Sequence, residues 1–289
     1  MNVYEIVTQK ILAELEKGNA PWRRPWAAGG LPRNFVTKNE YRGLNCFLLQ
    51  LNHLCEPYYL TFNQIKNLNG SVKSGAESHL VIYWKWMESK TETDEKGKAK
   101  RYPLLRYYRV FNIEQVHGIK YQSAVKQLTK FEKINHCEQI IAEYKNRPPV
   151  IHIKQQAYYN PIEDHINLPV KESFESHEEY YATLFHELIH STGHSSRLNR
   201  EEITTTSPFG SEEYSKEELV AEMGAAFLCA QTGISNRTLA NSAAYIRTWL
   251  SHLKKDCRIL FHAASQSQKA VDYIVNSTTE ENKIPKEEN

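Results

Sequence analysis

The first apolar side chains of the chain recur at every fourth position, at Val3, Val7, Ile11 and Leu15. Because side chains four residues apart lie on one face of an α-helix, this pattern predicts an amphipathic helix over residues 3–17 that ends near Gly18. The segment that follows, PWRRPWAAGGLPRN, is rich in proline and glycine and is typical of an ordered loop. Two shorter helices are expected over residues 44–54 and 61–68.

Two runs of β-branched and aromatic residues predict a pair of strands, HLVIYWKWM at 79–87 and LLRYYRVFN at 104–112. The charged segment between them contains few apolar residues, so we expect it to be a hairpin loop. Successive side chains of a strand face opposite sides of the sheet. The first strand therefore presents two pairs on opposite faces, Tyr83 with Lys85 and Trp84 with Trp86. We expect one of these pairs to belong to the core.

The remainder of the chain is expected to be mostly helical after a polar connection. Periodicity predicts a helix over 134–144, two short strands within 150–155 and 164–169 around a turn at 158–161, and helices from Ser176 onward. The expected fold class is α+β, with a small mixed amino-terminal domain over 1–133 and a mostly helical domain over 134–275. Residues 276–289 lack large apolar side chains apart from Ile284, so we expect a disordered tail.

Composition excludes several classes of protein. The 289 residues are 40% hydrophobic and 11% aromatic, which is enough for a packed core. No apolar run reaches the ~18–20 residues of a membrane helix, and an amino terminus with Glu5, Glu14 and Glu16 is not typical of a secretory signal. The five cysteines are scattered without a Cys-x-x-Cys pair, which argues against a disulfide framework or a cysteine-rich zinc finger. We therefore expect a cytoplasmic protein that makes no membrane contact.

Charges and aromatic residues are divided unevenly along the chain. Residues 1–133 contain 21 Lys or Arg and 12 Asp or Glu, a net charge of +9, whereas the rest contains 15 and 22, a net charge of −7. Residues 1–133 also contain 18 of the 32 aromatic residues and four of the five tryptophans. A basic, aromatic-rich half can attract polyanions, so the asymmetry favours two domains with different partners.

The segment HELIH matches the pattern His-Glu-x-x-His. On a helix, positions four apart lie on one face, so His186 and His190 can direct ring nitrogens at one metal ion. Neutral imidazoles suit Zn²⁺, and Glu187 would lie beside the open coordination position, where a carboxylate can accept a proton from water. The spacing of Ser176 and Glu179 is that of a capping box at the start of such a helix.

A catalytic zinc site needs a third protein ligand. A third histidine six residues after His190 would complete one known zincin pattern, but that position is Ser196. His194 lies four residues after His190, on the same helical line, and is an alternative ligand or a residue of the outer coordination sphere.

Two glutamates of a later helix are better candidates for this ligand. Glu218 and Glu222 are four residues apart in YSKEELVAEMGAAFLCAQTG and share a face. We expect Glu218 to be the third ligand and Glu222 to hydrogen-bond a ligand histidine. Glu218 also has the spacing of a capping-box partner of Ser215, which leaves a purely structural role open. Glu217 is expected to be a solvated helix charge.

The loop WRRPW at 22–26 combines flat aromatic faces with fixed positive charges. Proteins hold single-stranded nucleic acids by stacking bases on aromatic side chains and by placing Lys and Arg along the phosphates. The candidate DNA contacts are Trp22, Arg23, Arg24, Trp26, Tyr41 and Arg42. The alternative, buried tryptophans beside solvated basic residues, is equally compatible with the composition.

Taken together, these segments resemble the ArdC family of plasmid antirestriction proteins and the related amino-terminal region of plasmid-borne conjugative primases. The matching stretches, in the order of the family, are PWRRPW, LPRNFVTKNEYRGLN, TFNQIKNLNGSVKSGAE, VIYWKW, YYRVFNIEQV, AYYNPIEDHINLP, YYATLFHELIHSTGHSSRLNR and EELVAEMGAAFLC. They cover nearly the whole chain apart from its tail. One departure is Ser191, where the family often has tryptophan.

The resemblance implies a single-stranded-DNA-binding domain followed by a zincin-like metallopeptidase domain. It implies a role in protecting incoming plasmid DNA from restriction during conjugation. Carried over to this chain, the zinc ligands are His186, His190 and Glu218, and the catalytic residue is Glu187. Two alternatives stay open: a zinc protease that DNA directs to DNA-bound proteins, and a plain metallopeptidase whose basic half is a scaffold that binds no DNA.

Overall fold

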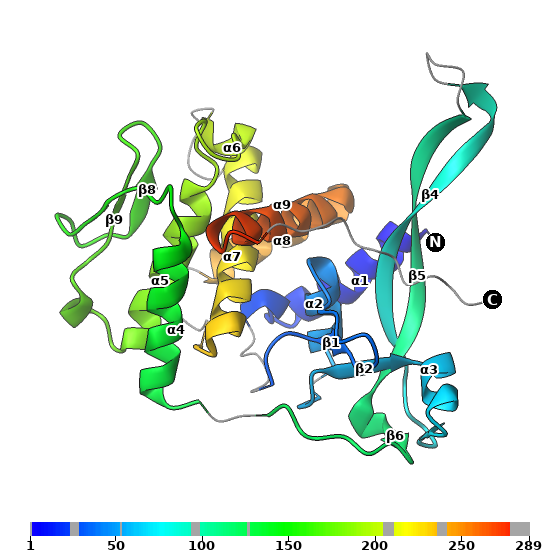
Figure 1. The fold of residues 1–289 in the computed structure, drawn as a ribbon. Helices are drawn as coiled ribbons and strands as arrows, with labels where there is room; N and C mark the ends of the chain where they lie inside the picture. The colour runs from blue at the N-terminus through cyan, green and yellow to red at the C-terminus, as the bar shows by residue number, and fades with distance from the viewer. Residues whose placement is uncertain are drawn as a thin grey trace. The chain divides into compact units, whose positions relative to one another are not determined.

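The structure is a computed structural model that describes residues 2–23, 29–52, 54–93, 99–125, 128–204, 211–235 and 242–277. The chain forms two compact units (Figure 1). Unit 1 comprises Met1–Pro21, Trp26–Lys126 and Leu250–Leu260. Unit 2 comprises Trp22–Pro25, Gln127–Trp249 and Phe261–Asn289. Each unit is thus assembled from segments that are distant in the sequence, and the fold as a whole is α+β.

Unit 1 is built on a four-stranded sheet with the order β1-β2-β5-β4. The strands are β1 (Arg33–Asn34), β2 (Tyr58–Thr61), β4 (His79–Thr93) and β5 (Ala99–Asn112). β1 and β2 are parallel, and the other neighbours are antiparallel. A small second sheet pairs β3 (Ser71–Val72) with β6 (Val116–His117).

The helices of the first half lie where periodicity predicts them. They are α1 (Val3–Glu16), α2 (Leu44–Gln50) and α3 (Phe62–Asn67). In α1 the predicted apolar face is buried at Val7, Ile11 and Leu15, and Asn2 caps the first turn through a capping box with Glu5.

The β4–β5 hairpin differs from its prediction. Its strands continue into the charged segment that we expected to be a loop, as far as Thr93 on β4 and from Ala99 on β5. From Val81 of β4 and Leu105 of β5 toward the tip of the hairpin, no further side chain whose burial is described belongs to the core. The expectation that one of the two pairs belongs to the core is therefore wrong: Leu105, opposite Trp84, is the outermost buried residue, while Trp84, Lys85 and Trp86 are exposed and Tyr83 is half-buried.

Unit 2 contains a three-stranded sheet, with the order β7-β9-β8, and several helices. The strands are β7 (Val150–Ile151), β8 (Tyr158–Asn160) and β9 (His165–Asn167). The predicted turn at 158–161 is instead largely the edge strand β8, because Tyr158 and Tyr159 pair with Asn167 and Ile166.

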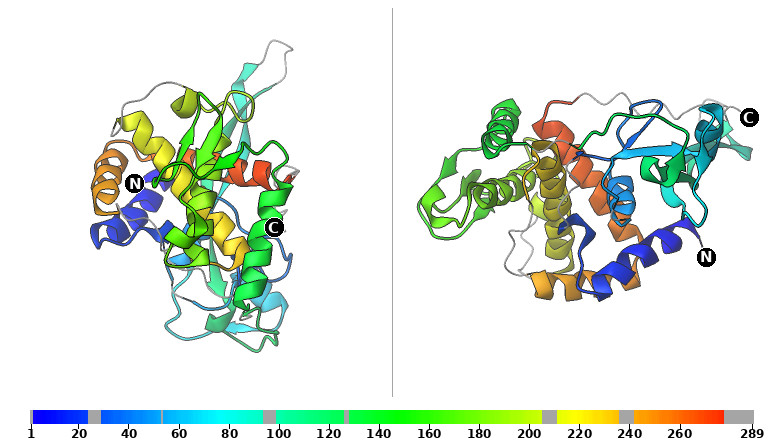
Figure 2. Two further views of the ribbon diagram at one scale, coloured as in Figure 1. Left: turned by 90° about the vertical axis from the view of Figure 1, so that its left-hand side faces the viewer. Right: turned by 90° about the horizontal axis from the view of Figure 1, so that it is seen from below.

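Two long helices form the centre of unit 2, and they carry the HELIH segment and the candidate glutamate ligands. They are α5 (His177–Ser191) and α7 (Glu212–Thr232), which lie side by side (Figure 1 and Figure 2). Ser176 caps α5 by accepting a hydrogen bond from the backbone N–H of Glu179, as its position predicts. A Cβ atom at Gly224 of α7 would lie 2.7 Å from Ile189 Cδ1, so glycine permits the close approach of the helices.

The remaining helices are α4 (Lys130–Glu143), α6 (Glu201–Thr204), α8 (Ser242–Lys255) and α9 (Arg258–Ile274). The predicted helix at 134–144 corresponds to α4, which begins one turn earlier because Thr129 provides its capping box with Glu132. Among the described helices, none is both long and apolar enough to cross a membrane.

Candidate metal centre

His186 and His190 of α5 and Glu218 of α7 direct their side chains toward one another. The Nε2 atoms of the two histidines are 3.1 Å apart. Glu218 Oε2 lies 3.6 Å from His186 Nε2, and Glu218 Oε1 lies 3.5 Å from His190 Nε2. The close contact between α5 and α7 therefore brings two imidazoles and one carboxylate to a single point.

These separations fit a single divalent metal ion. Ligand atoms about 2.0–2.1 Å from a tetrahedral zinc ion lie about 3.3 Å apart, close to the three separations in the cluster. Two histidines and a glutamate form a common ligand set of catalytic zinc sites, which keep the fourth position open. All three side chains are buried. Within the described part of the chain, this is the cluster of residues able to hold a metal.

The charges of the cluster are arranged to favour a cation. Burial alone would lower the pKa of His190, but hydrogen bonds with the carboxylates of Glu217 and Glu218 outweigh it and raise that pKa. Burial would raise the pKa of Glu218, but hydrogen bonds with His186 and His190 hold it well below its usual range. The carboxylate of Glu218 is therefore ionised in this environment.

Glu187 follows the first histidine and is buried beside the cluster. Burial raises the pKa of its carboxyl group, partly offset by the two histidines. The backbone of Tyr159 in β8 also hydrogen-bonds to this carboxylate. A carboxylate with a raised pKa, held by an edge strand next to a metal site, is well suited to accept and return a proton.

Glu217 is the outer partner of the cluster, and the prediction of a solvated charge is wrong. Its Oε1 lies 3.1 Å from His190 Nδ1, and its carboxylate also accepts hydrogen bonds from Arg200 Nε at 2.9 Å and from Nη2 at 2.6 Å. Arg200 is buried and also donates to Thr192 Oγ1 at 2.6 Å. The carboxylate–histidine pair fixes the ring of His190 so that Nε2 faces the cluster.

A signal for Glu217 exists in the sequence. Gly224, seven residues later, lies on the same stripe of α7 and touches Ile189 of α5. A small residue on a helix face favours close contact with another helix, so a charged residue on that stripe faces α5 rather than water. Arg200 has no comparable signal, because it follows α5 in a loop whose path the sequence pattern does not determine.

Glu222 takes a different position from the one predicted. Its carboxylate accepts hydrogen bonds from Arg23 Nε at 3.2 Å and Nη2 at 2.6 Å, rather than from a ligand histidine. One helical turn separates Glu222 from Glu218, enough to move it away from the histidine rings. Arg23 is correspondingly engaged in an ion pair inside unit 2, which removes it from the predicted DNA contacts.

His194 lies outside the cluster. The helix ends at Ser191, and the ring of His194 is half-exposed with its Nδ1 2.7 Å from Ser196 Oγ. Because α5 ends before residue 194, His194 does not continue the helix face that carries His186 and His190, and it does not join the cluster.

A second buried arginine fixes the edge strand beside Glu187. Arg197 donates to Asp164 Oδ2 at 3.0 Å, to the hydroxyl oxygen of Tyr159 at 3.0 Å and to the carbonyl of Ser191 at 2.7 Å. This guanidinium lowers the pKa of Asp164. It ties the end of α5 to the β8–β9 turn, a role that the sequence did not indicate.

The residues predicted to contact DNA differ in how far they are exposed to solvent. Trp22 is 1% exposed and packs edge-on against Trp249 with ring centroids 5.4 Å apart, and Tyr41 is also buried. Neither ring offers a face to a base, so these two predictions are wrong. Arg42 is half-exposed. Arg24 and Trp26 lie outside the described residues.

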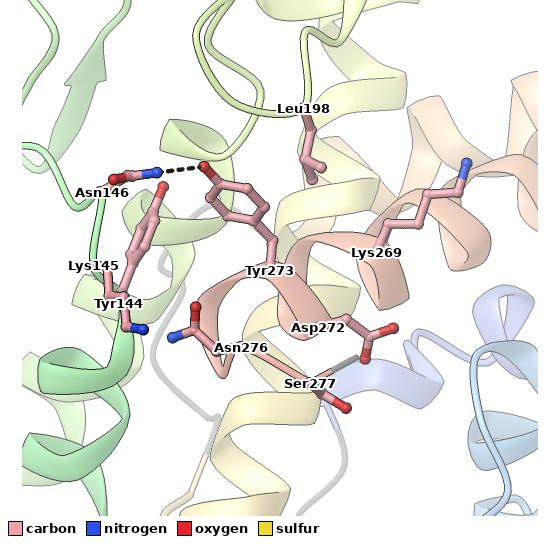
Figure 3. Close-up of a pocket in the computed structure, with 9 residues that line it drawn as sticks. All are labelled: Tyr144, Lys145, Asn146, Leu198, Lys269, Asp272, Tyr273, Asn276 and Ser277. Atoms are coloured by element: carbon pink, nitrogen blue, oxygen red, sulfur yellow. Dashed lines mark hydrogen bonds between the residues drawn. The ribbon is translucent and has the colours of Figure 1, made fainter. Parts of the chain in front are cut away.

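A cavity of about 680 Å³ in unit 2 (Figure 3) is lined by none of the residues of the metal cluster. Its lining residues are Tyr144, Lys145, Asn146, Leu198, Lys269, Asp272, Tyr273, Asn276 and Ser277. The hydroxyl group of Tyr144 is 3.1 Å from Ser191 Oγ, and Asn146 Nδ2 donates to the Tyr273 hydroxyl at 3.0 Å. The metal cluster and this cavity are therefore separate features of unit 2.

Two protein-family models match the chain. Residues 1–111 match the N-terminal domain of anti-restriction factor ArdC, and residues 135–266 match a zincin-like metallopeptidase. Among similar proteins, two DNA primases TraC of Escherichia coli are each 32% identical over 94% of this chain, which spans only 27% and 20% of their length. An uncharacterized protein y4eC of Sinorhizobium fredii is 32% identical, and the chain covers 91% of it.

Solved structures agree with these sequence matches. The metal-free crystal structure of the antirestriction protein ArdC from plasmid R388 matches with a TM-score of 0.78 and 34% identity, over 95% of this chain and 97% of that one. Its Mn(II)-bound structure matches with a TM-score of 0.77 and 33% identity, over 98% and 100%. Both family models, in this order along one chain, and structural matches over 95% and 98% of the chain lead to one conclusion. The chain belongs to the ArdC family of antirestriction proteins.

Proposed function

We propose that this protein binds single-stranded DNA, protects incoming plasmid DNA from restriction during conjugation, and carries a zinc metallopeptidase site. The observation that carries the peptidase part is the convergence of His186, His190 and Glu218 beside the buried Glu187. The DNA part is supported by family membership and by the net charge of +9 over residues 1–133.

The proposed metal is zinc, held by His186, His190 and Glu218. The relative from plasmid R388 has a Mn(II)-bound structure, so manganese is the competitor to test. Two imidazoles favour zinc, which binds nitrogen ligands more tightly than manganese does. Metal content after purification without added metal, measured by mass spectrometry, should give one zinc per chain. Glu218→Ala should lose it, whereas Glu222→Gln, on the same helix but outside the cluster, should retain it.

The proposed chemistry is hydrolysis of a peptide bond. When bound, the metal supplies Lewis-acid polarisation at the open position. Glu187 takes a proton from the attacking water as the water oxygen bonds to the carbonyl carbon, and returns a proton to the amine nitrogen as the C–N bond breaks. Glu217 keeps the ring of His190 oriented throughout.

The Glu187→Gln variant tests this assignment. It should keep its metal, because Glu187 is not a proposed ligand, and it should lose cleavage of denatured protein substrates. Cleavage that persists in Glu187→Gln would show that the wrong base is named. Measuring cleavage with and without single-stranded DNA distinguishes a DNA-directed protease, which needs the DNA, from a plain metallopeptidase, which does not.

Conjugation assays test the protective role. Transfer of an unmodified plasmid into a restricting recipient should be more efficient with the parent protein than without it. If Glu187→Gln protects as well as the parent, protection works by covering the DNA. If protection disappears while DNA binding remains, it depends on cleavage.

A further inference from the structure

The β4–β5 hairpin carries large aromatic side chains that lie outside the core and are partly exposed. Trp84 and Trp86 of β4 are 43% and 56% exposed, and Tyr107 of β5 is 41% exposed. Figure 1 shows the far end of this hairpin extending away from the other elements of unit 1. Exposed large aromatic residues that cluster in this way are uncommon on a protein without a ligand for them.

The pairing register assigns these residues to one side of the hairpin. Directly opposed residues in an antiparallel pair share a face. The opposed pairs on this side are Leu80 with Arg109, Ile82 with Tyr107, Trp84 with Leu105, Trp86 with Pro103, and Glu88 with Arg101. We call this side the tryptophan face; the opposite side carries Lys85, opposed to Leu104, and Tyr102, opposed to Met87.

Positive charge stands at both ends of the tryptophan face. Arg109 lies at its inner end, where it donates to Ser78 Oγ at 3.1 Å, and Arg101 lies at its outer end, 3.4 Å from Glu88. Both partners of the Arg101 pair are about two-thirds exposed, so water screens the pair and Arg101 can still attract an anion. Residues 79–112 contain eight Lys or Arg and four Asp or Glu, a net charge of +4.

We infer that the tryptophan face is a stacking surface for single-stranded DNA, with bases on Trp84, Trp86 and Tyr107 and phosphates near Arg101 and Arg109. This inference rests on the proposed function and adds to it the surface that binds the DNA. Flat rings at alternate positions of a strand can take successive bases, as other sheet proteins do with single strands. Duplex DNA keeps its base faces stacked inside the helix and offers none to such a surface.

Trp84 and Trp86 differ in their contacts with the rest of unit 1. The ring of Trp84 is contacted edge-on by Tyr4 with centroids 6.2 Å apart, and Arg258 lies 6.0 Å from the Tyr4 ring. Trp84 is therefore steadied by α1, and its replacement would also disturb packing in unit 1. Trp86 is the more exposed of the two, so its replacement tests the ligand surface with less effect on the fold.

The experiment measures the affinity of the full-length protein for a labelled oligothymidine by fluorescence anisotropy at low salt. Trp86→Ala should weaken binding about 5-fold to 140-fold, which corresponds to ~1–3 kcal/mol per stacked base. Trp86→Phe keeps a flat ring and should restore most of the affinity. The matched control is Tyr102→Ala, which removes a ring that is 48% exposed from the opposite face of the same hairpin and should leave the affinity unchanged.

Each result is decisive for one of the two proposals. If the parent binds the oligonucleotide and Trp86→Ala binds equally well, the tryptophan face is not the DNA surface, although DNA binding itself stands. Equal losses in Trp86→Ala and Tyr102→Ala would overturn the choice of face. If the parent shows no binding, the proposed function fails first. Circular dichroism and a thermal melt of each variant establish that a loss of affinity does not come from unfolding.

Discussion

Replacing Glu217 with alanine separates the two tasks that its carboxylate performs. Glu217 holds His190 through Nδ1 and balances the charge of Arg200. The side chains of Arg200 and Glu217 are only 2% and 4% exposed. Glu217→Ala therefore leaves a guanidinium inside the protein without this counter-charge and a proposed metal ligand without its outer partner.

The expected magnitudes follow from these contacts. Removing one partner of a buried ion pair costs ~3–5 kcal/mol in the free energy of unfolding. Arg200 keeps hydrogen bonds to Thr192 Oγ1 and to the carbonyl of Ile189, so we expect the lower end of this range, ~3 kcal/mol. Loss of the outer partner of a ligand histidine weakens metal binding about 10-fold to 100-fold.

The two effects can be measured separately. Urea unfolding in the presence of a chelator gives the stability of the metal-free protein, and competition with a chromophoric chelator gives the metal affinity. Adding Arg200→Met to Glu217→Ala removes the unpaired charge, so it should recover part of the stability but none of the metal affinity. Glu143→Ala, at an exposed glutamate of the same unit, should change the stability by less than about 0.5 kcal/mol.

Two results would refute this reasoning. An unchanged unfolding midpoint in Glu217→Ala would mean that the Arg200 pair is solvated in solution. An unchanged metal affinity in a folded variant would mean that His190 needs no partner for its orientation, or that it is not a ligand.

Three further perturbations test other parts of the structure. Gly224→Ala should lower the urea midpoint, because overpacking against Ile189 costs ~1–3 kcal/mol and exceeds the gain of ~1 kcal/mol in helix propensity; a higher midpoint would contradict the close helix contact. Arg197 lowers the pKa of Asp164 in the folded state, so the ionised Asp164 carboxylate stabilises the fold above the unfolded-state pKa of ~4. This stabilisation is lost as the pH falls through the lowered folded-state pKa. The stability difference between the parent and Asp164→Asn should therefore shrink from pH 7 to pH 3, and a constant difference would exclude charge as its cause. Trp22→Ala should cost ~3–5 kcal/mol of stability, yet its folded fraction should bind single-stranded DNA as the parent does. Weaker binding by that folded fraction would return Trp22 to the DNA surface.

Short-range patterns predicted the elements and the innermost part of the candidate site. The four-residue spacing of α1 and the capping residue of α5 depend on neighbours in the chain, and both are as expected. His186, His190 and Glu218 meet because the spacing within each helix selects one face, and α5 and α7 press those faces together.

Features that depend on tertiary contacts could not be fully predicted from the sequence. Which glutamate of α7 supports His190 depends on the rotation of that helix, which the position of Gly224 indicates only in part, because adjacent residues on a helix point about 100° apart. Glu217 therefore faces α5, while Glu222 meets Arg23 from a segment 199 residues away in sequence. Composition likewise could not show that Trp22 is buried and Trp86 exposed, because both rings sit among basic residues in the sequence.

The ion pair between Arg23 and Glu222 has a consequence for how this protein can be divided. Arg23 belongs to unit 2, although more than 100 residues of unit 1 separate it from the rest of that unit. A fragment beginning at Gln127 would lose both Arg23 and the Trp22 ring that packs on Trp249. We therefore expect the zincin-like half expressed alone from Gln127 to be less stable than the same half in the full chain. The TraC primases are similar over 94% of this chain, as expected if the two halves are inherited together.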